Sequence, residues 1–262
     1  MNFDFKIKTS GQLAELKNFL LAYAPNQVNL ANTSKSDDLF ALASDLASVN
    51  TTTRICLHYS IASNYHGSLV KAIDRFVKFV DWVEQINPKL NILLVSGGQK
   101  KKLTTASLLE IYQSTFPNSR RRFGVAFNPF YPDLDSEKQT LRRKLNTDLV
   151  DSLYFQLGDD LTKLQQGLEF VKAELADLGL SQTIRLFGSV LYVTKWNLFK
   201  LQFRPLSGVF YSKNFFSSEL TARQISQQII SLYEQFGFLI LWEFVTIPQA
   251  IKLVTESHER IN

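Results

Sequence analysis

Asp4 is the residue whose setting in this sequence suggests acid chemistry. Phe3 and Phe5 flank it in an alternating stretch, so a strand would turn its side chain away from both rings. If the rings contact helices, the carboxyl lies inside the sheet, where loss of water raises its pKa and suits it to act as a general acid. The alternative, which is the commoner one for such a residue taken alone, is a structural ion pair with Lys6 or with an arginine.

Two more polar residues fall near the ends of predicted strands. His58 closes "RICLH" and is either a ligand-binding imidazole or a core histidine bonded to a backbone carbonyl. Since no second His or Cys stands at ligand spacing, we expect no metal. Gln156 closes "SLYFQ", and its amide can donate to and accept from a ligand ring or, equally, cap a loop.

A basic run and a tryptophan are the next candidates. Lys144 follows Arg142 and Arg143 on a predicted helix and could neutralise a phosphate, although such a run is usually a solvated helix face. Trp196 lies in a long irregular insertion expected at residues 193–219. There it could stack on a planar ligand or fix the insertion to the fold.

The stretch "NILLVSGGQKKK" runs from an aliphatic strand into Ser96, Gly97 and Gly98. Two adjacent glycines suit a sharp turn and a close backbone approach to a ligand. The lysines that follow could attract phosphate or form a solvated loop.

Eight strand-like stretches alternate with helix-like ones along the chain. The strands are expected at residues 3–8, 26–32, 53–60, 90–96, 122–128, 151–157, 183–192 and 238–244. This alternation predicts a parallel sheet, and eight units in 262 residues favour a (β/α)8 TIM barrel formed as a single domain over residues 1–262. The alternative is an open doubly wound sheet, against which stands the lack of a G-x-G-x-x-G after the first strand.

Composition narrows the class of protein. The single cysteine, Cys56, excludes an internal disulfide and indicates a reducing compartment. The sequence shows no apolar leader and no apolar run long enough for a membrane, so we expect a cytoplasmic protein. The net charge of +5 could attract nucleic acid, but the basic clusters are not interleaved with aromatics, which argues against that partner. The sequence leaves a homo-oligomer open.

Several short matches in the same order resemble the methylenetetrahydrofolate reductase family. They are "FDFKIKT", "RICLHYS", "NILLVSGG", "GVAFNP", "LRRKLNTDLVDSLYFQL" and "VTKWN", spread over residues 3 to about 252. The resemblance implies an eight-stranded barrel that carries FAD and reduces methylenetetrahydrofolate with NAD(P)H.

Several functional positions of that family have counterparts here. The resemblance implies that Asp4 is the acid that protonates the folate, one methylene shorter than the family's glutamate. It likewise implies that His58 contacts the flavin and that Gln156 contacts the folate. By the same resemblance, the remaining contacts are Glu137 for the flavin ribose, Lys144 for the FAD phosphates and Trp196 for the nicotinamide or pterin ring.

The sequence departs from the family in the loop after the fourth strand. The family has R-G-D there, whereas Ser96, Gly97 and Gly98 stand in this chain, so the arginine and the aspartate are both missing. Three hypotheses therefore follow. The first is an FAD-dependent reductase, the second is a divergent relative that binds folate or flavin as a methyl-transfer or regulatory partner, and the third is a basic nucleic-acid-binding domain.

Overall fold

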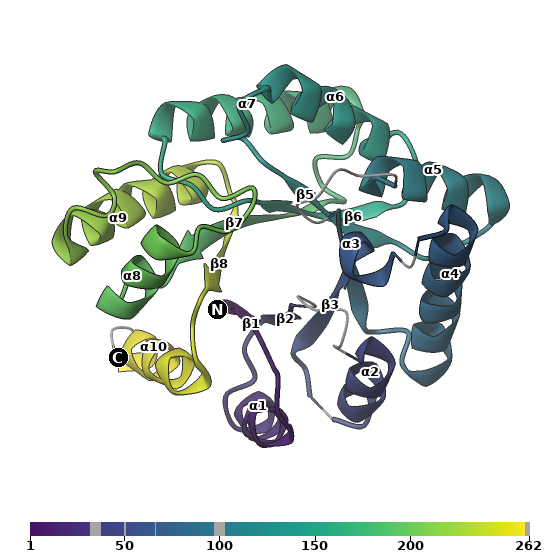
Figure 1. The fold of residues 1–262 in the computed structure, drawn as a ribbon, viewed down its shortest axis with the longest axis horizontal. Coiled ribbons are helices and arrows are strands. Elements are labelled where there is room, and N and C mark those ends of the chain that lie inside the picture. Colours follow the sequence, from purple (N-terminus) through teal and green to yellow (C-terminus); the bar gives the residue numbers. More distant parts are fainter. Residues whose placement is uncertain (32–37, 50, 66, 97–102, 260–262) are drawn as a thin grey trace. The chain divides into compact units, whose positions relative to one another are not determined.

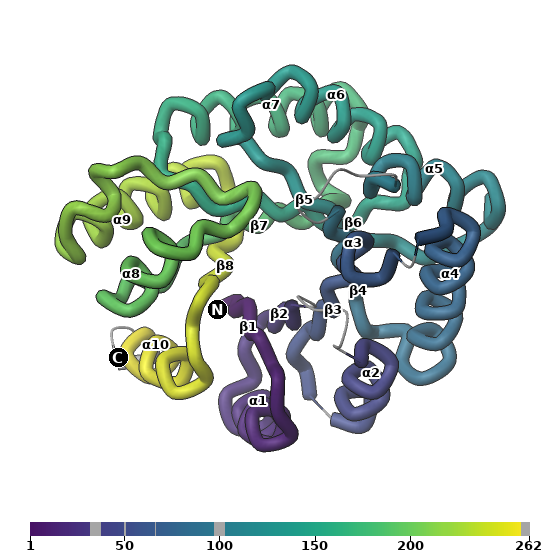
Figure 2. The backbone as a smooth tube through the Cα atoms, viewed as in Figure 1, coloured from purple at the N-terminus to yellow at the C-terminus, as the bar shows by residue number. Residues whose placement is uncertain are grey.

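A closed barrel of eight parallel strands, in sequence order β1 to β8, forms the sheet of this protein. The structure is a computed structural model that describes residues 1–31, 38–49, 51–65, 67–96 and 103–259. The predicted fold class is thus confirmed, and all eight expected strands are present. The backbone can be followed from β1 to α10 in Figure 2.

The chain divides into two compact units. Unit 1 comprises Met1–Thr104 and Phe244–Asn262, and unit 2 comprises Thr105–Glu243. The expectation of a single domain stays a prediction. In the described part of the chain, no helix is long and apolar enough to cross a membrane.

Unit 1 holds the first four strands with their helices. Its elements are β1 (Asn2–Phe5), α1 (Ser10–Tyr23), β2 (Gln27–Leu30), α2 (Leu39–Ala47), β3 (Arg54–Ser60), α3 (Ile61–Asn64), α4 (Leu69–Ile86), β4 (Asn91–Val95) and α10 (Ile247–Glu259). Helices α1, α2 and α4 lie on one side of these strands (Figure 1). Pro248 falls in the first turn of α10, where its missing N–H costs nothing.

Aromatic packing fixes which way the strands of unit 1 face. Phe3 and Phe5 both pack edge-on against Phe19 of α1, with ring centroids 5.8 Å apart in each case. Because neighbouring residues of a strand point to opposite faces, Asp4 lies on the face opposite the helices. We call this face of each unit its inner face. The condition set in the sequence analysis, that the phenylalanine rings contact a helix, is therefore met.

Unit 2 holds the other four strands. Its elements are α5 (Thr105–Thr115), β5 (Phe123–Phe127), α6 (Leu134–Leu145), β6 (Val150–Phe155), α7 (Leu161–Asp177), β7 (Arg185–Leu191), α8 (Lys195–Phe203), α9 (Glu219–Gln235) and β8 (Leu239–Glu243). Helix α8 occupies the start of the segment expected to be an irregular insertion, so that expectation was wrong for these nine residues.

Ring contacts orient the strands of unit 2 in the same way. Phe155 of β6 packs edge-on against Tyr233 of α9 with centroids 6.1 Å apart, so it faces the helices. Tyr154 and Phe187 stack at 4.7 Å on the inner face, where β6 and β7 run side by side. The residues that continue this alternation, Gln156 after β6 and Ser189 within β7, belong to the inner face as well.

Candidate functional site

The structure brings Asp4 and His58 together on the inner face of unit 1. His58 Nε2 lies 3.5 Å from Asp4 Oδ2, and both side chains are nearly buried. Burial lowers the pKa of His58 from 6.5 to about 4, so its ring is neutral at pH 7. The contact is therefore no ion pair at neutral pH, and at this distance Nε2 makes no hydrogen bond.

Asn29 extends this polar group and was missed by the sequence analysis. It stands beside Asp4 in the register of β1 with β2, and its side chain is fully buried. Its Oδ1 accepts a hydrogen bond of 2.7 Å from Gln27 Nε2, while Nδ2 has no partner. Buried donors of this kind are normally satisfied by water or by a ligand. An asparagine inside the short apolar stretch "QVNL" was the available signal.

The loop after β4 is only partly described. Ser96 follows Val95 and is half-buried. Gly97 and Gly98 lie outside the described residues, so the expected turn and ligand approach stay predictions. Within the described residues, no three His, Cys, Asp or Glu gather as metal ligands.

Glu137 and Lys144, the predicted contacts of an FAD, both bond to β5 or to the loop after it. The Lys144 ammonium donates a 2.7 Å hydrogen bond to the Ala126 carbonyl, and the lysine is 5% exposed. Glu137 Oε1 accepts a 3.1 Å bond from the Asn128 backbone N–H. Both side chains therefore stabilise the fold of unit 2. The alternative of a solvated face suits Arg142 and Arg143 but was wrong for Lys144.

The inner face of unit 2 carries three polar groups toward the carboxyl ends of adjacent strands, with Gln156 just after β6, Ser189 within the last half of β7 and Glu243 at the end of β8. Phe155 pairs with Gly188, so the next residues, Gln156 and Ser189, lie side by side. Ser189 in turn hydrogen-bonds the Glu243 carboxyl at the end of β8. We call Gln156, Ser189 and Glu243 the polar row. The sequence analysis found Gln156 and missed the other two members.

Glu243 is the titratable member of the polar row. Burial raises the pKa of its carboxyl from 4.5 to about 7, and the hydrogen bond from the Ser189 hydroxyl opposes that shift. A carboxyl with such a pKa is part protonated at neutral pH, and it can then donate a hydrogen bond as well as accept one. Groups tuned in this way occur preferentially in functional sites.

The segment 204–218 lies along the carboxyl ends of β5 and β6. Asn128 Nδ2 donates a 2.8 Å bond to the Gly208 carbonyl, and Phe210 forms a parallel bridge with Gly158. The Ser212 backbone N–H donates to Asp159 Oδ1 at 2.9 Å. These three attachments hold a long connection against the strand ends, which is where barrel enzymes build their sites.

Tyr211 joins this segment to the polar row. Burial, followed by the negative charges of Glu243 and Asp159, raises the pKa of its phenol well above 10. Its ring stacks on Phe215 with centroids 4.2 Å apart. A groove of about 510 Å³ next to it is lined by residues of α8 and of the segment, including Leu201, Val209 and Tyr211. The phenol therefore stays neutral beside Glu243.

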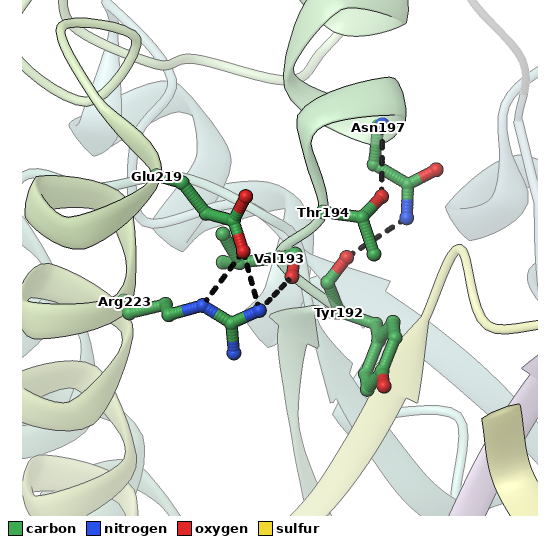
Figure 3. A network of polar contacts seen from close by, with 6 residues as sticks. All are labelled: Tyr192, Val193, Thr194, Asn197, Glu219 and Arg223. Atoms are coloured by element: carbon green, nitrogen blue, oxygen red, sulfur yellow. Dashed lines mark hydrogen bonds and ion pairs between the residues drawn. The ribbon is translucent and has the colours of Figure 1, made fainter.

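Trp196 lies on the exposed surface of α8. It is 69% exposed, and its ring lies 6.0 Å from that of Phe199, inclined by 17°. The neighbouring residue holds the helix instead, because Asn197 Nδ2 donates a 2.8 Å bond to the Tyr192 carbonyl (Figure 3). The alternative that Trp196 fixes this segment to the fold was therefore wrong, and a stacking role stays a prediction.

A second contact in Figure 3 fixes the end of β7 to α9. Arg223 Nη2 donates to the Val193 carbonyl at 3.0 Å and to Glu219 Oε1. The Thr194 hydroxyl caps α8 by accepting from the Asn197 N–H. The strand end beside the polar row is thus held from both of the helices that follow it.

A closed barrel of eight parallel strands with alternating helices places this protein among the TIM barrels. No family model and no curated protein matches this chain. An uncharacterized protein from Clostridium thermocellum that binds two copies of 5-methyl-5,6,7,8-tetrahydrofolic acid matches in structure with a TM-score of 0.59 and 11% identity, over 97% of this chain and 94% of that one.

Other solved barrels match to a similar degree. A chitinase-like lectin from tamarind has a TM-score of 0.55 and 12% identity, over 97% of this chain and 98% of that one. A 2,3-dimethylmalate lyase of the PEP mutase/isocitrate lyase superfamily has a TM-score of 0.54 and 10% identity, over 99% and 81%. At such identities the likeness shows the fold, because one barrel supports many chemistries.

Proposed function

We propose that this protein binds a reduced folate at the carboxyl ends of its strands. The observation that carries this proposal is the polar row, in which Gln156 after β6 lies beside Ser189 of β7, and Ser189 hydrogen-bonds to Glu243 at the end of β8. The resemblance to methylenetetrahydrofolate reductases assigns the folate contact to Gln156. The Clostridium thermocellum barrel that binds 5-methyltetrahydrofolic acid gives independent support for this class of ligand.

The chemistry of the row suits a pterin. The edge of that ring carries N–H donors next to carbonyl and ring-nitrogen acceptors, so a site must offer both kinds of group. The Gln156 amide does so with one side chain, and Ser189 and Glu243 add groups of either kind. Tyr154 and Phe187, stacked below them on the same face, form an apolar floor.

Binding of 5-methyltetrahydrofolate, measured by isothermal titration calorimetry, tests the proposal. We expect saturable binding by the wild-type protein and about fivefold weaker binding by Gln156→Ala, because a hydrogen bond to a ligand contributes about 1 kcal/mol. Gln165→Ala is the matched control, since that amide on α7 bonds only to exposed Glu169. No binding by the wild type, or equal loss in both variants, would contradict the proposal.

The second candidate function is reduction of methylenetetrahydrofolate with FAD and NAD(P)H. It is favoured by the pairing of Asp4 with His58, which the resemblance makes the acid and a flavin contact. A bound flavin would supply hydride transfer, and Asp4 would give a proton to the folate. In the observed arrangement the FAD contacts do not fit, because Lys144 and Glu137 bond within unit 2 and Ser96 carries no charge. A relative that binds folate without turnover agrees with that misfit.

A visible spectrum before and after addition of FAD separates the two candidates. A reductase acquires bound-flavin absorption, whereas a protein that only binds folate stays colourless. For a reductase we predict that Asp4→Asn abolishes folate reduction and leaves NAD(P)H oxidation by an added quinone intact, since only the folate step needs the proton. Equal loss of both activities would show that Asp4 is not the acid.

A further inference from the structure

Glu243 occupies a constrained position at the end of β8. It pairs with Leu191 in the register of β7 with β8, and Ser189, two residues earlier on the same face, donates to its carboxyl. The next residue, Phe244, has a φ of 61°, a left-handed conformation that a bulky side chain rarely adopts. Local strain of this kind is kept where surrounding contacts over-determine the backbone, and it recurs at functional positions.

Two phenols lie near Glu243 in unit 2, and a second carboxyl acts on one of them. Tyr211 of the segment 204–218 and Tyr233 of α9 both interact with its charge, and burial raises the pKa of both phenols above their usual value. Asp159 acts on Tyr211, and it accepts hydrogen bonds from Ser212. Ser189 is the hydrogen-bond donor that favours the ionised form of Glu243.

We propose that the protonated carboxyl of Glu243 donates a hydrogen bond to the reduced folate bound at Gln156, so that ionisation of Glu243 releases the ligand. This inference rests on the proposed function and assigns to it a residue that the family resemblance does not supply. Two observations of geometry carry it: Glu243 is the last residue of β8, and it lies on the same face as Gln156. The hydrogen bond from Ser189 supports it.

The direction of the pH dependence follows from the donor requirement. A neutral carboxyl can donate to a carbonyl oxygen or a ring nitrogen, whereas a carboxylate only accepts. Binding that needs one proton weakens about tenfold for each pH unit above the pKa of the group that holds it. His58, whose pKa lies at about 4, does not titrate in the same range.

The experiment is the dissociation constant of 5-methyltetrahydrofolate between about pH 6 and about pH 9, measured by calorimetry on the full chain. We expect a constant affinity at the acid end and weakening above about pH 7, where Glu243 ionises. Glu243→Gln keeps a donor and loses the charge, so its affinity should not change with pH.

Ser189→Ala supplies a second, independent variant. It removes the hydrogen bond that favours the ionised carboxyl, so the pKa of Glu243 rises and the weakening should begin at higher pH than in the wild type. Glu234→Gln, at an exposed position of α9, is the matched control and should keep the wild-type profile. Circular dichroism of each variant verifies that it is folded.

The outcomes separate this inference from the function on which it rests. Binding that weakens with pH in the wild type, is flat in Glu243→Gln and is shifted in Ser189→Ala supports the inference. A dissociation constant for folate that does not change with pH in the wild type overturns the role of Glu243 and leaves the proposed function standing. The same holds if Glu243→Gln keeps the pH profile of the wild type. No folate binding at any pH overturns both.

Discussion

At the scale of single residues, burial acts in opposite directions on the two titratable groups that matter most. It lowers the pKa of His58 to about 4 and raises that of Glu243 to about 7, because in each case the charged form loses its water. At neutral pH the histidine is therefore uncharged and the glutamate part protonated. Neither state could be assigned from the residue types alone.

The neutral state of His58 predicts a loss of stability in acid. Below pH 6.5 the unfolded chain takes up a proton on His58 that the folded chain accepts only near pH 4, so the free energy of unfolding falls as pH falls through this window. We expect His58 to contribute a loss of about 2 kcal/mol between pH 7 and about pH 5.

Urea unfolding of the wild type and of His58→Gln at both pH values measures that contribution. The variant should lose less stability than the wild type on acidification, because its amide does not titrate. Glu243 contributes in the opposite direction, because its raised pKa increases the free energy of unfolding as pH falls toward 4.5. This contribution is the same in both proteins, so it cancels when they are compared. Parallel losses in both proteins would show that His58 is not the group responsible.

At the scale of elements, the helices approach the strands at glycine positions. A Cβ on Gly188 of β7 would stand 2.4 Å from the Tyr233 ring of α9, and one on Gly167 of α7 would stand 2.5 Å from the Pro129 side chain. Real Cβ atoms do not approach so closely. Gly188 therefore allows β7 to pack closely against α9, and Gly167 allows α7 to pack closely against the loop after β5. The close contact between Gly188 and Tyr233 also holds β7, the strand that carries Ser189, against α9.

We predict that Gly188→Ala lowers the free energy of unfolding by about 1–3 kcal/mol, since the fully buried Tyr233 ring must move to admit the methyl group. Gly11→Ala is the matched control. At that position of α1 the added Cβ meets only the Thr9 hydroxyl at 3.9 Å, so stability should stay equal or rise by up to about 1 kcal/mol. Equal effects of the two substitutions on the free energy of unfolding, measured by heat or urea, would show that the close contact with Tyr233 does not limit the residue at position 188.

At the scale of the whole molecule, the barrel holds the strands in place, and the proposed site is formed by polar residues toward the strand ends. Many of the described basic residues are engaged in ion pairs, such as Arg142 with Glu174 and Arg143 with Glu110, at 2.8 Å each. Each such pair is electrically neutral and adds nothing to the net charge of +5, and the expectation that nucleic acid is not the partner stays a prediction. Structural matches to a lectin and a lyase show how widely this frame is reused.

The alternation of strands and long helices could be predicted from the sequence, because amphipathic patterns depend on residues that are close together in the chain. The sequence also pointed to Asp4, His58 and Gln156, which stand at or near strand ends. Helix α8 was not predicted, since its apolar residues lie on the exposed side as well as the buried side, so no single apolar stripe set against a polar face marks it as a helix packed on a core.

The contacts between side chains distant in the sequence could be seen only in the folded protein. Lys144 reads as a free cation in the sequence, yet its ammonium is bonded to a strand carbonyl. Glu243 reads as one charge in an apolar stretch, yet its pKa depends on burial and on Ser189, 54 positions earlier in the chain. Desolvation and pairing between distant residues arise when strands far apart in sequence are placed side by side, and for that reason the polar row became visible only in the folded protein.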